Sequence, residues 1–251
     1  MPILDFLALS LSTEKYANTK ICNGLAGETT LAQMPQLKAC FEESYRQLDR
    51  MIAFTAAVED RLNVHLRHGT IPDADLVEKL AVCKIKCIDV ATQRVHALRQ
   101  EVGSYALMWD TGFELVDMLL TCKFAEGDSR ILQQKLARDR LKRVQKGGVG
   151  GMVGDVFSTN SAEAIAAISL ARKLAPAGRD LQKMAAALDV NWRELYGLSD
   201  MICERHINST QGSKFIEPCV ERLRASSNEY DHDWKSKLGS STIPSASSAR
   251  A

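Results

Sequence analysis

A Glu-Gly pair stands directly before a strongly helical run in Phe124-Ala125-Glu126-Gly127-Asp128-Ser129-Arg130-Ile131-Leu132-Gln133-Gln134-Lys135-Leu136-Ala137-Arg138. Glycine inside a helix costs about 1 kcal/mol relative to alanine, so we expect Gly127 at a helix entry, with Asp128 or Ser129 capping the free amides. Glu126 then lies in a turn, where a carboxylate can act as a general base if its surroundings tune its pKa. The alternative is an exposed acidic residue near a helix start.

Upstream of this stretch, apolar residues recur at the spacing of helices over long segments. Helix boundaries are marked by Pro35, which is harmless at a helix start, and by Gly69, Pro72 and Asp73 between two helices. The predicted helices run from about residue 4 to 20, 35 to 68, 73 to 101 and 113 to 120, and a further one starts near residue 129. We therefore predict an all-α fold, an antiparallel bundle of long helices without an alternating strand pattern.

Two segments are expected to lack regular structure because of their glycines. Residues 22–30 contain Gly24 and Gly27 and are expected to form a loop. The run Lys146-Gly147-Gly148-Val149-Gly150-Gly151-Met152-Val153-Gly154 is expected to interrupt the helix that precedes it. We interpret residues 146–160 as a flexible linker; a phosphate-binding loop is the alternative, but no Lys-Ser/Thr follows it.

The glycine-rich run predicts a division of the chain into a main bundle and a smaller part. Residues 1–145 would form the bundle, and residues 161–238 a small helical appendage with shorter helices near 161–174, 180–188, 192–206 and 218–225. One apolar face of the appendage is expected to pack on the bundle. The last 13 residues, 239–251, are rich in serine and are expected to be disordered.

Composition limits the classes of function. The chain has 251 residues, of which 45% are hydrophobic and 25% charged, as in ordinary globular proteins. With 32 Lys and Arg against 31 Asp and Glu, no overall field attracts nucleic acid. Apolar runs are too short to cross a bilayer, no secretion signal is evident, and the seven cysteines form no CxxC pair. We expect a soluble intracellular protein with reduced thiols; cytoplasm, mitochondrion and peroxisome are not distinguished.

Other candidate site residues have simpler structural interpretations. His65 and His68 could bind a metal only if carboxylates converged on them, and we interpret them as cations at a helix C-terminus, so no metal site is predicted. Cys83 and Cys87 share a helix face and are interpreted as packing residues. Trp109 is interpreted as a packed anchor at the end of the bundle. No dinucleotide-binding or phosphate-loop motif occurs.

The stretch around Glu126 resembles the C-terminal part of the acyl-CoA dehydrogenase and acyl-CoA oxidase family. In that family an aromatic or apolar residue, the catalytic Glu, Gly, Thr or Asp, and a helix ending in Ala-Arg follow in this order, here from Phe124 to Ala137-Arg138. Gln100-Glu101-Val102-Gly103-Ser104 is similar to the family's Gln-x-x-Gly-Gly flavin contact, with Ser104 for the second glycine. Tyr16-Ala17-Asn18-Thr19-Lys20 is similar to a Tyr-x-x-x-Arg segment, with Lys20 for Arg. The resemblance covers about residues 3–145.

This resemblance implies a function in acyl-CoA oxidation. Glu126 would take the α-proton of an acyl-CoA while the β-hydrogen leaves as hydride to FAD. The implied FAD contacts are Lys20, Gln100, Gly103 and Asp128, and the implied substrate contacts are Gly127 and Arg138. Family members form homo-oligomers in which flavin contacts cross subunits. The resemblance would place the start of this sequence inside the first helix of the family's C-terminal domain, and either upstream sequence or a partner would then supply the family's N-terminal helical and middle β domains.

Three hypotheses therefore remain open from the sequence. The chain is part of an acyl-CoA dehydrogenase-like flavoenzyme, with Glu126 as its base. Alternatively, it is a helical-bundle interaction or assembly subunit that has lost flavin binding, which Ser104 and Lys20 favour. In the third hypothesis, the chain is an unrelated helical scaffold in which the Glu-Gly match is a coincidence.

Overall fold

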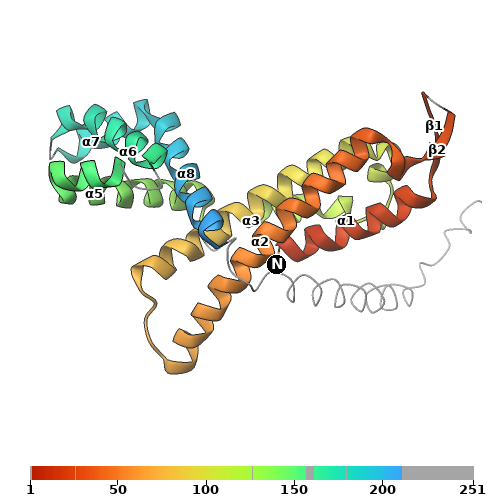
Figure 1. Ribbon diagram of the computed structural model, residues 1–251, viewed down its shortest axis with the longest axis horizontal. Coiled ribbons are helices and arrows are strands. Elements are labelled where there is room, and N and C mark those ends of the chain that lie inside the picture. Colours follow the sequence, from red (N-terminus) through yellow and green to blue (C-terminus); the bar gives the residue numbers. More distant parts are fainter. Residues whose placement is uncertain (1, 26, 126, 157–160, 179, 211–251) are drawn as a thin grey trace, which may run out of the picture.

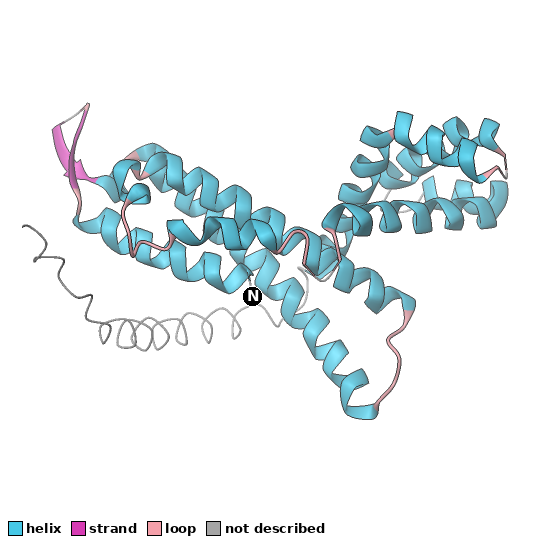
Figure 2. Cartoon of the chain, turned by 180° about the vertical axis from the view of Figure 1, so that it is seen from behind, coloured by secondary structure: helices cyan, strands magenta, loops and turns pink. Residues whose placement is uncertain are grey.

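The part of the chain that the structure describes is almost wholly helical (Figure 2). The computed structural model describes residues 2–25, 27–125, 127–156, 161–178 and 180–210, with only the backbone for residues 148–156. The longer helices are α1 (Pro2–Thr19), α2 (Pro35–His68), α3 (Ala74–Glu101), α5 (Ser129–Val156), α6 (Ser161–Leu174), α7 (Leu181–Val190) and α8 (Trp192–Thr210). A short helix, α4 (Val116–Thr121), follows two 3-10 turns, Gly103–Leu107 and Phe113–Leu115. The predicted all-α fold is confirmed.

A proline, a glycine and an aspartate cap determine where the two helices of the α2–α3 hairpin begin and end. Pro35 occupies the first turn of α2, and Gly69 ends it in the left-handed conformation with φ 61°. The Asp73 side chain accepts a hydrogen bond from the Leu76 amide at 2.7 Å and so caps α3. Along α2, Leu37, Phe41, Leu48, Ile52 and Val58 are buried on the face that meets its neighbours.

Two groups of helices give the molecule its shape (Figure 1). Helices α1, α2 and α3 lie side by side in a long bundle, while α5 packs against α6 and α8 in a second group. The end of α2 and the start of α3 project away from both groups as a hairpin tip. One buried apolar cluster continues through both groups, with Phe54 and Ile85 in the first and Leu170 and Ile202 in the second.

The segment from residue 22 to 30 is not a plain loop. Strand β1 (Ile21–Gly24) pairs in antiparallel fashion with β2 (Gly27–Thr30), with Ile21 opposite Thr30. Each strand has four residues, too few for an alternating pattern to stand out in the sequence. The glycines mark the turn of this hairpin, which extends from one end of the bundle (Figure 1).

The predicted interruption of a helix at Lys146 is wrong. Helix α5 continues through the glycine-rich run to Val156. Each glycine lowers helix stability by about 1 kcal/mol, but packing against neighbouring helices can exceed such intrinsic preferences. Here α5 packs along both α6 and α8. The division of the chain into domains remains a prediction.

The appendage helices are close to their predicted bounds. Helix α6 matches residues 161–174, α7 is capped by the Asp180 side chain, and α8 runs four residues beyond the predicted end at His206. The helix predicted at 218–225 and the tail from residue 239 lie outside the described residues.

The prediction that Trp109 is a packed anchor is wrong, because 84% of its surface is exposed. Tyr105 takes that place: its ring stacks on Tyr16 with the centroids 3.8 Å apart and meets the edge of Phe113. The 3-10 turn ends at Leu107, and Asp110 follows with φ 62°, so the chain turns away from the core at Trp109. The sequence does not distinguish which aromatic residue of this segment is buried.

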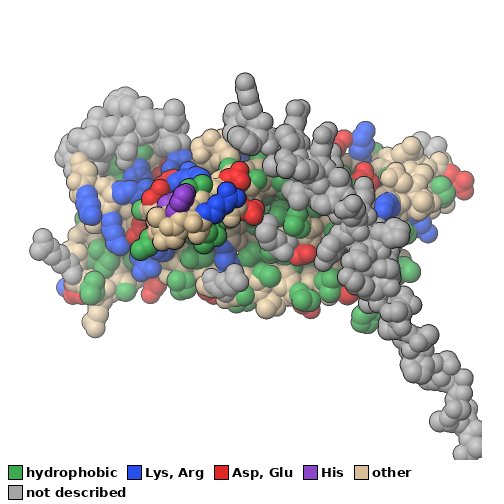
Figure 3. Space-filling view, turned by 90° about the horizontal axis from the view of Figure 1, so that it is seen from below, with side chains coloured by type: hydrophobic (Ala, Val, Ile, Leu, Met, Phe, Trp, Pro, Cys, Tyr) green, Lys and Arg blue, Asp and Glu red, His purple; other side chains and the backbone are tan. Residues whose placement is uncertain are grey.

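The surface carries charges of both signs. In Figure 3 the Lys and Arg side chains are interspersed with Asp and Glu over the visible face. Within the described part of the chain, no helix is both long and apolar enough to cross a membrane.

Candidate functional site

The loop between α4 and α5 carries the Glu-Gly pair. After α4, the amides of Lys123 and Phe124 bond to the carbonyls of Leu120 and Thr121, both at 3.0 Å. The loop closes with the Ser129 amide bonded to the Lys123 carbonyl, also at 3.0 Å. Glu126, the predicted catalytic base, lies outside the described residues.

Gly127 and Asp128 directly precede α5, as the sequence predicts. The Asp128 carboxylate accepts a hydrogen bond from the Arg130 amide at 2.6 Å, so it caps the helix. Gly127 has φ +100°, a conformation that only glycine adopts readily. No atom lies within 4 Å of the position that a Cβ would take there, so backbone conformation, not close packing, accounts for the glycine.

Lys84 holds this loop against the middle of α3. Its ammonium donates hydrogen bonds to the carbonyls of Ala125 and Gly127 and lies 3.5 Å from the carbonyl of Lys123. Farther along α3, Asp89 forms an ion pair with the Lys123 side chain at 2.8 Å. The sequence gives no sign of this role for Lys84, because a lysine on a mixed helix face carries no local signal of a partner 41 residues away.

The other predicted cofactor contacts gather at the far end of α3. Gln100 lies in its last turn, with its amide nitrogen 3.4 Å from His96 Nε2, and Gly103 follows with φ +62°. Lys20 is exposed directly after α1, and its carbonyl accepts the Leu31 amide at 2.8 Å. The stack of Tyr16 on Tyr105 joins these two segments. The end of α1 therefore lies beside the start of the first 3-10 turn.

The structure separates the predicted residues of the 123–129 loop from those at the far end of α3. Gln100 follows Lys84 by 16 residues on one helix, which is about 24 Å at 1.5 Å per residue. Lys84 touches the Glu126 loop, so Lys20, Gln100 and Gly103 are not brought to that loop within one chain. Arg138 is also apart: it follows Asp128 by ten residues, about 15 Å along α5, and bonds to the Gln134 carbonyl at 3.2 Å.

The residues at the far end of α3 have side chains of the types that bind a phosphate-bearing cofactor. Lys20, Gln100 and Ser104 are all exposed, and they offer an ammonium, an amide and a hydroxyl at the same end of the bundle. The left-handed backbone at Gly103 leaves open space where a side chain would stand. This set can contact a diphosphate, but it does not enclose one.

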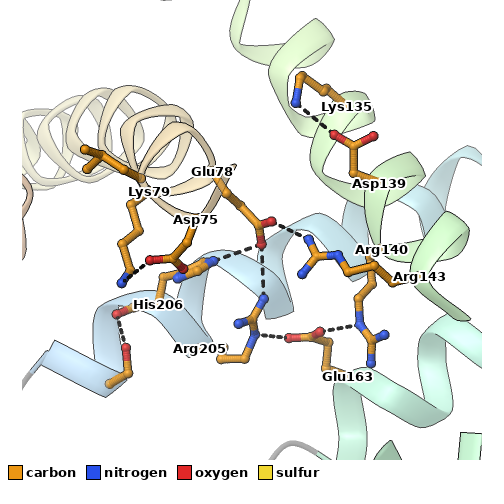
Figure 4. Close-up of polar contacts among 12 residues, drawn as sticks. Asp75, Glu78, Lys79, Lys135, Asp139, Arg140, Arg143, Glu163, Arg205 and His206 are labelled. Carbon is orange, nitrogen blue, oxygen red and sulfur yellow. Dashed lines mark hydrogen bonds and ion pairs between the residues drawn. The ribbon is translucent and has the colours of Figure 1, made fainter. Parts of the chain in front are cut away.

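A network of charged side chains around two largely buried carboxylates joins α3, α5, α6 and α8 (Figure 4). Glu163, 5% exposed, accepts hydrogen bonds from Arg140 at 2.8 Å and Arg205 at 2.7 Å. Glu78 pairs with Arg205 at 3.2 Å, with His206 at 2.9 Å and with Arg143. Each carboxylate is committed to cations from other helices, so we interpret the network as structural.

The pKa of Glu78 reflects this environment. Burial raises the pKa, but the hydrogen bond from His206 and the charge of Arg143 outweigh burial, so the pKa lies below its ordinary value of 4.5. Sequence reasoning missed this network because its members come from four separate helices.

The cysteines and histidines singled out in the sequence have structural roles. Cys87 is buried with its sulfur 3.5 Å from the Thr55 hydroxyl, and Cys83 packs against the core. Burial raises the pKa of both thiols. His65 and His68 lie in the last turn of α2, as predicted, and His65 Nδ1 is 2.9 Å from the Thr70 hydroxyl. Among the described residues, no group of His, Cys, Asp or Glu is arranged to hold a metal.

The fold is similar to that of acyl-CoA oxidases of known structure. An acyl-CoA oxidase from tomato (Lycopersicon esculentum) superimposes with a TM-score of 0.57 and 15% identity, over 83% of this chain and 37% of the oxidase. Arabidopsis thaliana acyl-CoA oxidase 1 gives a TM-score of 0.58 and 17% identity, over 83% of this chain and 36% of the oxidase. No protein-family model and no curated protein sequence matches.

The chain therefore spans little more than a third of each oxidase. At such low identity the likeness concerns the fold.

Proposed function

We propose that this chain provides the C-terminal helical part of a flavin-dependent acyl-CoA dehydrogenase or oxidase, with Glu126 as its general base. The observation that carries the proposal is the likeness to two acyl-CoA oxidase structures over 83% of the chain. The Phe-Ala-Glu-Gly-Asp sequence directly before α5 adds a chemical group suited to proton abstraction.

The proposed chemistry assigns a separate task to each group of residues. Glu126 accepts the α-proton of an acyl-CoA, and Gly127 and Asp128 set the backbone that follows it. FAD supplies the hydride acceptor when it is bound. Lys20, Gln100 and Gly103 contact the cofactor, while Arg138 on α5 is a substrate contact only if the substrate extends along that helix. A polypeptide that supplies the N-terminal and β domains completes the pocket.

The separation of about 24 Å between the two groups favours self-association. If one copy contributes the Glu126 loop and another contributes Lys20, Gln100 and Gly103, neither site is complete in a single chain. The segment that connects the two groups carries exposed apolar side chains, which we call the 107–124 surface: Leu107, Met108, Trp109, Leu115, Met118 and Phe124. Aromatic residues and methionine are enriched at protein interfaces. We assign this surface to contact with a second copy.

The assay for the proposed function is anaerobic reduction of FAD by octanoyl-CoA. The tagged chain is expressed in its native cells and purified with the polypeptides that accompany it. We expect loss of flavin absorbance in the parent, and a rate about 10²–10⁴-fold lower in Glu126→Gln, which keeps the shape of the side chain but accepts no proton. Glu59→Gln, at an exposed position on α2, is the matched control and should react like the parent. Equal rates for Glu126→Gln and the parent would refute the assignment.

A non-catalytic assembly subunit is the second candidate function. It is favoured by Ser104 and Lys20, which replace a glycine and an arginine of the family pattern. A parent assembly that holds no FAD in this assay would support this alternative over the enzyme.

A further inference from the structure

The 107–124 surface is acidic as well as apolar. Residues 107–122 contain no lysine or arginine, and they carry three exposed acids: Asp110, Glu114 and Asp117. Among the residues that the structure describes, no cation forms an ion pair with any of the three. Lys123, which follows, is committed to Asp89. If this surface packed against its own copy across a two-fold axis, like charges would face one another at a cost in free energy. A basic partner avoids that cost.

One exposed face of α5 is basic. Its cations recur at the three- and four-residue spacing that places side chains on one face of a helix, and we call this row the α5 basic stripe: Lys135, Arg138, Lys142 and Lys146. Asp139 is the single acid between residues 130 and 146, and it pairs with Lys135 at 2.8 Å (Figure 4) and with Lys142 at 3.2 Å. Four cations and one anion leave a net charge of +3. Ile131, one turn earlier on the same face, is an exposed apolar residue.

Other exposed cations are neutralised within the chain. Arg61 on α2 pairs with Asp75 at 2.7 Å, and Lys173 on α6 pairs with Glu194 at 2.6 Å. The α5 basic stripe has four cations for one acid, so its excess charge is available to an acidic partner.

We propose that the 107–124 surface of one copy binds the α5 basic stripe of a second copy, an inference that rests on the self-association in the proposed function. Helix α4 packs on α3, whereas α5 packs on α6 and α8 in the second group of helices (Figure 1). Because the two surfaces differ, a two-fold dimer contains the contact twice, once in each direction. The apolar side chains of the 107–124 surface and Ile131 form the centre of each contact, and the opposite charges lie around it.

Exchange of charges between Asp117 and Lys142 tests this contact. We expect Asp117→Lys and Lys142→Glu each to weaken the dimer about tenfold or more, because each variant alone places like charges together in both contacts. An equimolar mixture of the two variants should restore a dimer as stable as the parent. In that heterodimer one contact has the exchanged charges and the other has the original ones. Analytical ultracentrifugation over a series of concentrations measures the dissociation constants, and circular dichroism checks that the helix content is unchanged.

Two matched controls reverse exposed charges outside both surfaces. Glu59→Lys alters α2, and Lys183→Glu alters α7. Each should dimerise like the parent, both alone and in an equimolar mixture. A loss of dimer in these controls would show that any charge reversal weakens association, and it would overturn the inference.

The other outcomes separate this inference from the proposed function. A Lys142→Glu variant that dimerises like the parent overturns the inference, and so do weakened variants that mixing does not restore. Lower affinity of Lys142→Glu for octanoyl-CoA with an unchanged dimer would assign the stripe to the substrate phosphates instead. None of these measurements needs FAD, so a dimeric parent without FAD leaves the inference intact while it refutes the enzyme. A monomeric parent overturns the inference, while the test of Glu126 as a base still stands.

Discussion

Gly127 and Gly147 are both glycines, but they adopt different backbone conformations. Gly127 has φ +100°, whereas Gly147 lies within α5, and a Cβ at either position would meet nothing within 4 Å. The space available for a side chain is therefore similar at the two positions, and the backbone conformation is what differs. The sequence predicted Gly127 correctly at a helix entry but predicted a break near Gly147, because local propensity takes no account of packing between helices.

The two alanine variants should change stability in opposite directions. We expect Gly127→Ala to lower the free energy of unfolding by about 1–2 kcal/mol, since alanine is strained at positive φ. Gly147→Ala should raise it by about 0.5–1 kcal/mol, the gain for alanine inside a helix. Urea denaturation monitored by circular dichroism measures both values. No gain from Gly147→Ala would favour the linker interpretation over the continuous helix.

At the scale of elements, hydrophobic periodicity and end signals were sufficient to predict the long helices. The Asp73 cap and the left-handed Gly69 are local features, and both lie where the sequence placed them. The charge network was not predictable, because Glu78 and Glu163 meet their partners only after four helices have packed. Lys84 was missed for the same reason.

Glu163→Gln should destabilise the contact between α5, α6 and α8. The substitution keeps the side-chain volume but leaves the charges of Arg140 and Arg205 without their shared carboxylate, and we expect a loss of about 3 kcal/mol. Glu194→Gln is the control, because its pair with Lys173 is exposed and should matter little. Equal urea midpoints for the two variants would contradict a structural role for the network.

Glu78 should make stability depend on acid pH. Its pKa is lowered below 4.5 in the folded protein, so its contribution is fully present above 4.5 and is lost as the pH falls through the folded pKa. The difference in unfolding free energy between the parent and Glu78→Gln should therefore shrink as the pH falls below 4.5. Urea titrations at a series of pH values measure this difference, and a constant difference would show that Glu78 is not stabilised as an anion.

At the scale of the whole molecule, the arrangement of the candidate site was only partly predictable. Gln100 and Glu126 are 26 residues apart in sequence, a spacing that resembles the family pattern. The structure adds that α3 keeps the Gln100 end about 24 Å from the Glu126 loop. Sequence spacing carries no information on that distance, because the returning segment includes turns and the short helix α4.

Self-association should depend on the 107–124 surface. We expect the parent to sediment as a dimer or larger species at micromolar concentration, and the double variant Trp109→Asp, Met118→Glu to sediment as a monomer, since charge in an interface core is costly. Leu66→Glu, which alters an exposed apolar residue near the end of α2, should behave like the parent. Analytical ultracentrifugation separates these outcomes, and a monomeric parent would contradict the shared-site arrangement.

The most direct test of Glu126 as a base is exchange of the α-protons of octanoyl-CoA in D₂O. The purified assembly is mixed with octanoyl-CoA under anaerobic conditions, and deuterium at the α-carbon is measured by mass spectrometry. Our account predicts that the parent incorporates deuterium and that Glu126→Gln does so about 10²–10⁴-fold more slowly, while Glu59→Gln matches the parent. Incorporation at the same rate in the parent and in Glu126→Gln would contradict the account.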